Sequence, residues 1–211
     1  GRAIVNLLGT EPGEKVKAFV SVKTFDEDRF IVMSTKKGKI KKTKLSAYGK
    51  PRKGGIYAID IREEDELIEA KITNGDNDIV LGTREGKSIR FPESDARPMG
   101  RKTKGVTGIK LSSKHDCVVG MVVVRREGTL LVATEKGYGK RTDVMQYRIQ
   151  KRSGKGVLAM RTNEKVGKMV AIMEVVDSDD LMVITDTGVL IRQPVESIRT
   201  IGRVTQGVKL I

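Results

Sequence analysis

The sequence repeats itself with a period of about 50 residues, and this feature constrains the fold more than any other. An apolar run ending in threonine is followed by two polar residues and a glycine, as in IVMSTKKG at residues 31–38. The pattern recurs at 79–86, 130–137 and 181–188, so the turn glycines Gly38, Gly86, Gly137 and Gly188 are 48, 51 and 51 residues apart. A glycine at this position is typical of a tight hairpin turn that needs positive φ. Each repeat therefore contains a β-hairpin.

A second motif, a glycine followed four residues later by an apolar residue, begins at Gly1, Gly55, Gly105, Gly156 and Gly207. Because two independent motifs recur with the same spacing, the chain is a tandem repeat. We expect one domain whose repeats span residues 1–54, 55–104, 105–155 and 156–206, with residues 207–211 beginning a further unit.

Four short strands are predicted in each unit; in the first they cover residues 3–8, 16–22, 30–33 and 39–43. The second alternates apolar and polar residues, and the third is continuously apolar, which predicts burial on both faces. The fourth is polar and basic, which predicts an exposed outer strand. Long helices are not expected, since no window carries an apolar stripe at helical spacing. Four-stranded antiparallel units arranged radially predict an all-β, propeller-like fold.

The chain is strongly basic, with 41 Lys and Arg against 27 Asp and Glu and a net charge of +14. Such a balance indicates nucleic acid or an anionic membrane surface as partner. The longest apolar runs, about eight residues, are too short to span a bilayer. A single cysteine and the lack of a secretory signal pattern predict a cytoplasmic protein. Scarce aromatic residues argue against binding of single strands by base stacking.

The positive charge is confined to one part of each repeat, the fourth strand and the connection to the next glycine motif. Residues 39–55, 87–105, 138–156 and 189–207 hold 22 of the 41 cations but only four of the 27 acids. Radial repetition would join these segments into a band that contacts the phosphates of double-stranded DNA. The candidate DNA-binding residues are Lys39, Lys41, Lys42, Lys44, Lys50, Arg52, Lys53, Lys87, Arg90, Arg101, Lys102, Lys104, Lys140, Arg141, Arg148, Gln150, Lys151, Arg152, Lys155, Arg192 and Arg203.

Three segments resemble a known family: GRAIVNLL at 1–8, GYGKRT at 137–142 and GRVTQGV at 202–208. They are similar to the C-terminal domain of DNA gyrase A and its topoisomerase IV relative, over essentially the whole chain. The resemblance implies a β-pinwheel whose perimeter wraps duplex DNA. It also implies that this noncatalytic domain works with the rest of gyrase A and with the other gyrase protein, gyrase B, supporting ATP-dependent negative supercoiling, and that ATP and Mg are used elsewhere in the complex.

The hallmark of that family is a seven-residue box of Gln, a basic residue, Arg, Gly, Gly, a basic residue and Gly, normally on the first blade. Residues 150–156 (QKRSGKG) match it everywhere except at Ser153. We expect the chain to be an excerpt that begins after the first blade, so the functional box is either this segment or one that precedes Gly1.

No catalytic or metal site is expected, and no cofactor in this domain. His115-Asp116-Cys117 offers too few ligands for zinc, and residues 137–140 lack the spacing of a P-loop. The four tyrosines, Tyr48, Tyr57, Tyr138 and Tyr147, lack the acidic metal-binding setting of a topoisomerase nucleophile; Tyr138 and Tyr147 are expected beside DNA or on the outer strand. Three hypotheses remain: a gyrase domain, a topoisomerase IV domain that bends DNA for substrate choice, and a propeller-like scaffold for protein interactions.

Overall fold

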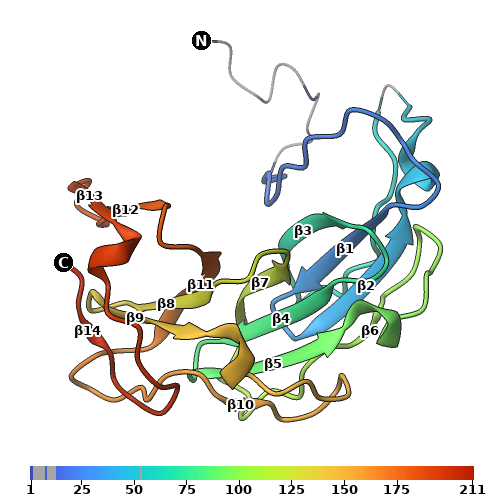
Figure 1. The fold of residues 1–211 in the computed structure, drawn as a ribbon. Helices are drawn as coiled ribbons and strands as arrows, with labels where there is room; N and C mark the ends of the chain where they lie inside the picture. Colours follow the sequence, from blue (N-terminus) through green and yellow to red (C-terminus); the bar gives the residue numbers. More distant parts are fainter. Residues whose placement is uncertain (2–7, 9–12, 53) are drawn as a thin grey trace.

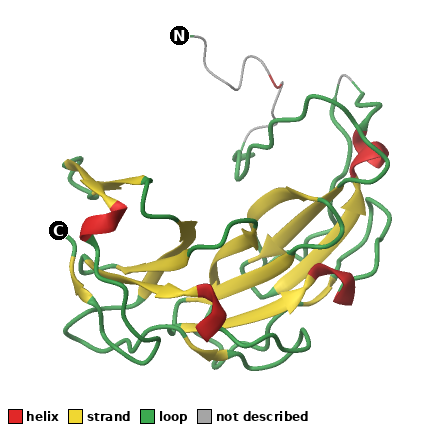
Figure 2. Ribbon diagram, in the orientation of Figure 1, coloured by secondary structure: helices red, strands yellow, loops and turns green. Residues whose placement is uncertain are grey.

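The computed structural model describes residues 1, 8, 13–52 and 54–211, and strands and loops make up nearly all of them (Figure 2). Within these ranges no helix is long and apolar enough to cross a membrane. The helical elements with defined bounds are the 3₁₀ turns η1 (Leu45–Tyr48), η2 (Glu93–Asp95), η3 (Val144–Gln146) and η4 (Val195–Ser197). The strands are β1 (Phe30–Thr35), β2 (Lys39–Lys44), β3 (Leu67–Thr73), β4 (Asp78–Thr83), β5 (Lys87–Pro92), β6 (Val106–Thr107), β7 (Val118–Val124), β8 (Thr129–Thr134), β9 (Tyr138–Asp143), β10 (Val157–Leu158), β11 (Met169–Val175), β12 (Asp180–Ile184), β13 (Leu190–Pro194) and β14 (Val208–Lys209).

The strands form three four-stranded antiparallel sheets and a final two-stranded one, which confirms the predicted all-β fold of repeated blades. Their orders are β3-β1-β2-β6, β10-β5-β4-β7, β11-β8-β9-β14 and β12-β13. Each four-stranded sheet takes its hairpin from one repeat, a long strand from the next repeat and a two-residue strand from the repeat after that. A blade is therefore not one contiguous unit of sequence, and successive repeats are interlocked.

The four predicted hairpins are all present. Their strands pair antiparallel, as in the register Ile31↔Thr43 between β1 and β2. The turn glycines have φ values of 81° at Gly38, 82° at Gly86, 73° at Gly137 and 86° at Gly188, which confirms the predicted positive φ.

The core lies between neighbouring sheets and is built from the first strands of the hairpins. Val32 on β1 packs in one cluster with Ile79 and Leu81 on β4, and Val80 on the other face of β4 packs with Val132 on β8. Such strands are buried on both faces, as their continuous apolar sequence predicts. Burial of each such side chain is worth about 1.5–3 kcal/mol, so the apolar runs hold adjacent sheets together.

The sheets stand side by side in an open arc (Figure 1). The long strands β3, β7 and β11 lie along its inner side, where β7 contacts both β3 and β11. The two-residue strands β6, β10 and β14 occupy the opposite edge of their sheets. Segments next to these short strands therefore face outward, and this outer side is where the connections between hairpins and glycine motifs run.

Two strand predictions in the first repeat differ from the structure. Residues 16–22 form no strand, because the equivalent strands β3, β7 and β11 pair with the hairpin of the preceding repeat, and no hairpin precedes residue 16 in the described part of the chain. Val22 nevertheless packs against the core cluster of Ile31, Met33 and Leu45. The strand predicted at 3–8 and the first glycine motif lie, apart from Gly1 and Leu8, outside the described residues.

The prediction that the basic fourth strand is exposed is wrong. Strand β2 lies inside its sheet between β1 and β6, and four of its six residues are buried. The same holds for β9, which lies between β8 and β14. Lysine and arginine can occupy such positions because their stems pack like apolar side chains while their charged ends find oxygen acceptors. The exposed outer element is the connection that follows.

Candidate nucleic-acid interface

Each basic connection is hydrogen-bonded to the fourth strand of the hairpin that lies one repeat earlier in the chain. The Met99 N–H donates to the Lys42 carbonyl at 2.8 Å, the Gln150 N–H to the Arg90 carbonyl at 2.8 Å, and the Ile201 N–H to the Arg141 carbonyl at 2.9 Å. The same bond therefore occurs three times at repeat-related positions. It places residues 96–105, 147–156 and 198–207 at equivalent places on successive sheets, which makes a continuous rim along the outer side of the arc.

The candidate DNA-binding residues divide into three groups. Nine are exposed: Lys44, Lys50, Arg52, Lys102, Lys104, Arg148, Lys151, Lys155 and Arg192. Three of these have an acidic partner, since Arg192 pairs with Asp180, Lys104 lies 3.8 Å from Asp60 and Lys44 lies 3.9 Å from Glu27. Seven are half-buried: Lys39, Lys87, Arg90, Arg101, Gln150, Arg152 and Arg203. Four are buried: Lys41, Lys42, Lys140 and Arg141. Lys53 lies outside the described residues.

The predicted exposure of the four buried cations is wrong, because all four are engaged by neighbouring repeats. The Lys42 ammonium lies 2.9 Å from a carboxylate oxygen of Glu93, and both side chains are almost completely buried. Arg141 pairs with Asp177 and donates to the Ile198 carbonyl at 2.5 Å. A phosphate could reach these groups only by displacing the contacts that join the sheets.

Two half-buried arginines on the rim also donate hydrogen bonds to backbone carbonyls, so only part of each guanidinium faces solvent. Arg152 donates to the carbonyls of Asp95 at 2.9 Å and Thr107 at 3.1 Å. At the equivalent position, Arg203 donates to the Leu158 carbonyl at 2.7 Å. Each arginine thus ties its connection to the short outer strand at the start of the same repeat, β6 for Arg152 and β10 for Arg203.

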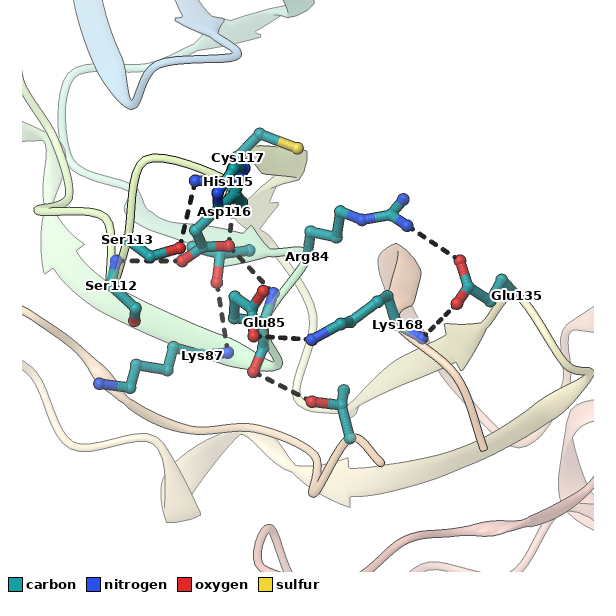
Figure 3. Close-up of polar contacts among 12 residues, drawn as sticks. Arg84, Glu85, Lys87, Ser112, Ser113, His115, Asp116, Cys117, Glu135 and Lys168 are labelled. Atoms are coloured by element: carbon teal, nitrogen blue, oxygen red, sulfur yellow. Dashed lines mark hydrogen bonds and ion pairs between the residues drawn. The ribbon is translucent and has the colours of Figure 1, made fainter. Parts of the chain in front are cut away.

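The acidic residues near the hairpin turns neutralise the cations there. Arg84 pairs with Glu135 at 3.1 Å, which links the hairpin turns of successive repeats, and Lys168, just before β11, pairs with Glu85 at 2.9 Å (Figure 3). Lys36 pairs with Glu66 in the same way. These ion pairs compensate part of the positive charge at the turns.

The His115-Asp116-Cys117 segment belongs to this turn network. Asp116 is buried and accepts the N–H groups of Glu85 at 3.0 Å, Ser112 at 3.1 Å and Cys117 at 3.0 Å (Figure 3). No group of three or more potential metal-binding side chains gathers anywhere in the described ranges. Asp116 is therefore a structural carboxylate that caps backbone N–H groups.

The candidate DNA-binding residues named from the sequence leave out four exposed cations that lie beside the rim. Lys110 and Arg161 each follow a glycine motif by five residues, and their N–H groups donate to the Gly154 and Thr205 carbonyls of the adjoining connections. Arg97 and Arg199 are exposed at the positions equivalent to Arg148. The repeat alignment was the available signal, since each of these residues has a basic equivalent one repeat away.

The model of the family described as "DNA gyrase C-terminal domain, beta-propeller" matches residues 29–74, 77–125, 128–175 and 179–211. The chain belongs to this family. It is 40% identical to DNA gyrase A of Haemophilus influenzae and 43% identical to that of Escherichia coli, in both cases over its whole length. It spans 27% and 24% of these proteins, about a quarter of their length.

Two solved structures share the fold of this gyrase-family chain. A DNA gyrase A C-terminal domain superposes with a TM-score of 0.90 and 23% identity, covering the whole chain and 70% of that domain. The C-terminal domain of a DNA topoisomerase IV gives 0.92 and 23%, covering the whole chain and 66% of that domain. The β-pinwheel fold that the resemblance implied is confirmed.

Ser153 differs from the gyrase-family box, and its backbone shows why glycine is preferred there. It has a φ of 70°, in the left-handed region, and its N–H donates to the Gly108 carbonyl at 2.6 Å. A residue with a Cβ is strained in this conformation, whereas glycine is not.

We predict that Ser153→Gly stabilises the domain by about 1 kcal/mol, because it removes the left-handed strain. Urea unfolding of the two proteins measures this difference. Ser153→Ala, which keeps the Cβ, is the control and should give no stabilisation. An unchanged or lower midpoint for the glycine variant would contradict the assignment of strain to this residue.

Two buried lysines of the fourth strands have altered acid–base behaviour. Burial, together with a smaller contribution from the charge of nearby Arg101, lowers the pKa of Lys41 from 10.5 to about 8. Burial likewise lowers the pKa of Lys140 to about 8, with Arg203 contributing. Between pH 8 and 10.5 the unfolded chain then binds more protons at these residues than the folded domain does.

We therefore predict that these two lysines make the domain more stable as pH rises from about 8 towards 10.5, and contribute no pH dependence below that window. Carbon-13 NMR of the domain with isotopically labelled lysine should show two Cε resonances titrating near pH 8, one lost in Lys41→Met and the other in Lys140→Met. If every lysine resonance stayed unchanged up to pH 9, the two ammonium groups would not be buried as described.

Proposed function

We propose that this chain binds duplex DNA along its basic rim and bends it around the arc, as the DNA-wrapping C-terminal domain of DNA gyrase A. The observation that carries the proposal is the rim itself: exposed cations recur at equivalent positions on the outer side of successive sheets. Contacts of this kind are made to phosphates and carry little base readout. Bending a site of 20–30 base pairs costs on the order of 1–6 kcal/mol, which several such contacts offset.

The domain contributes no catalytic group in this proposal. It works with the remainder of gyrase A and with gyrase B, which together form a bacterial type II topoisomerase in the cytoplasm, and supports negative supercoiling driven by ATP bound elsewhere in the complex with Mg. The identity of 40–43% to DNA gyrase A supports gyrase over topoisomerase IV. The fold does not distinguish them, since the two TM-scores are 0.90 and 0.92.

Salt dependence tests the phosphate contacts. If about 6–10 phosphates are neutralised, affinity for a duplex should fall by roughly 10³–10⁵ between 50 and 200 mM salt. Fluorescence anisotropy with a labelled 40-base-pair duplex measures this. A flat salt dependence would favour a protein-interaction scaffold.

Plasmid topology tests wrapping. A nicked plasmid is sealed by ligase with the domain bound and then deproteinised. Wrapping leaves a change in linking number proportional to bound protein, and a positive change is expected for gyrase. Binding without any change would indicate bending short of a wrap, as in the topoisomerase IV hypothesis.

A further inference from the structure

Lys41 on β2 and Lys140 on β9 are buried, and their ammonium groups donate hydrogen bonds to backbone carbonyls of the rim connections. The Lys140 Nζ donates to the Gly202 carbonyl at 2.8 Å, to the Thr205 carbonyl at 3.1 Å and to the Arg203 carbonyl. It also lies 3.2 Å from Thr205 Oγ1. The Lys41 Nζ donates to the Arg101 carbonyl at 2.6 Å and the Ala58 carbonyl at 2.5 Å. The side chains of Lys140 and Lys41 are 0% and 1% exposed.

We infer that Lys41 and Lys140 are positioning residues of the rim: they hold the backbone of residues 101 and 202–205 and so fix the connections 96–105 and 198–207, whose exposed cations are Arg97, Lys102, Lys104 and Arg199. The inference deepens the proposed function and rests on it. An ammonium group has three donors and no acceptor, so one lysine can satisfy several carbonyls that converge on it. Without that donor, the carbonyls at the buried end of the loop lose their partner and the loop loses its fixed shape.

In the middle sheet, an apolar residue stands at the position where the other two four-stranded sheets have a buried lysine. Ile89 occupies the position equivalent to Lys41 and Lys140 and is fully buried. The connection above it is held by Arg152, through the carbonyls of Asp95 and Thr107, in the way that Arg203 also ties the connection above Lys140. Gly154 lies against Ile89, where an added Cβ would be 3.4 Å from Ile89 Cδ1. An apolar side chain is therefore compatible with the fold at this position, provided that the loop has another support.

A buried lysine that orders the rim loop before DNA binds changes DNA affinity without adding a phosphate contact. A rim segment that is already ordered loses less conformational freedom on binding, and preorganisation of this kind raises affinity. A direct contact, in contrast, releases counterions and changes the salt dependence of binding. These two roles therefore give different signatures in the same titration.

The test compares Lys140→Met with Lys151→Met in the 211-residue chain, using anisotropy with a 40-base-pair duplex from 50 to 200 mM salt. For Lys140→Met we expect affinity to fall about three- to tenfold at every salt concentration, with an unchanged slope of log K against log salt. For the exposed Lys151→Met, we expect the slope to become shallower by about 0.9. Lys140→Arg, which retains a donor, should recover part of the lost affinity.

Hydrogen exchange without DNA gives an independent readout. Amides of residues 202–206 should exchange faster in Lys140→Met, and those of residues 150–156 should not change. A shallower salt slope for Lys140→Met would overturn the inference in favour of a direct phosphate contact, and unchanged affinity and exchange would overturn it altogether. If the unaltered chain fails to bind DNA, the proposed function fails, whereas the exchange result still decides whether Lys140 orders the loop.

Discussion

Replacing Gly86 by alanine should destabilise the domain by about 3–5 kcal/mol, a large part of the about 5–15 kcal/mol that a domain has. The turn has a φ of 82°, which costs an alanine about 1–2 kcal/mol. In addition, a Cβ at this position would collide with the Met160 carbonyl oxygen. That backbone cannot move away freely, because the Gly86 carbonyl accepts the N–H groups of Ala159 and Met160 at 2.8 and 3.1 Å. Urea unfolding measures the loss.

Gly188 provides a matched control for this substitution. It is the equivalent turn glycine of the last hairpin, with a φ of 86°, but an added Cβ there meets no atom within 4 Å. Gly188→Ala should therefore cost only the backbone strain, about 1–2 kcal/mol. Equal losses at the two sites would show that contact between the hairpin turn and the next repeat adds nothing to stability.

The hairpins were predictable from sequence because their signals are local. A buried apolar run, two polar residues and a glycine such as Gly86 lie within eight consecutive residues, and strand and turn chemistry act over that distance. Sheet composition was not predictable in this way, because β6 pairs with a hairpin two repeats earlier. Periodicity fixes which residues form strands, whereas it contains no information about which repeat supplies a partner.

The positive charge of the rim was predictable, but the role of each cation was not. Lys140 and Lys151 have similar surroundings in the sequence, yet one is buried beneath backbone carbonyls and the other is exposed. Burial of a long side chain depends on acceptors that come from distant residues. One signal was present, since the position of Lys41 and Lys140 is occupied in the other two repeats by Ile89 and Ile191. Alternation of lysine with isoleucine indicates an inward-facing site.

The largest effect on DNA binding is expected from reversing three exposed rim cations together, Arg148, Lys151 and Lys155, to glutamate. Loss of three phosphate contacts should make the salt slope shallower by about 2.7 and lower the affinity on the order of a hundredfold at 100 mM salt. Anisotropy titrations against duplex DNA measure both quantities. The melting temperature should stay close to that of the unaltered domain, because exposed side chains rarely change stability much.

A second triple variant separates the effect of where the cations lie from the effect of net charge on DNA binding. In this variant the exposed Lys114, Lys136 and Lys165 near the hairpin turns are changed to glutamate. It changes the net charge by the same amount at positions outside the rim connections. Exposed charges farther apart than about 10 Å are largely screened at 0.1 M salt, so this variant should lose about fivefold or less in affinity and keep its salt slope. If both variants weakened binding equally, the whole charge of the domain would attract DNA without a defined path. A defined path requires the rim variant alone to change the slope, because only a cation in contact with a phosphate releases a counterion when DNA binds.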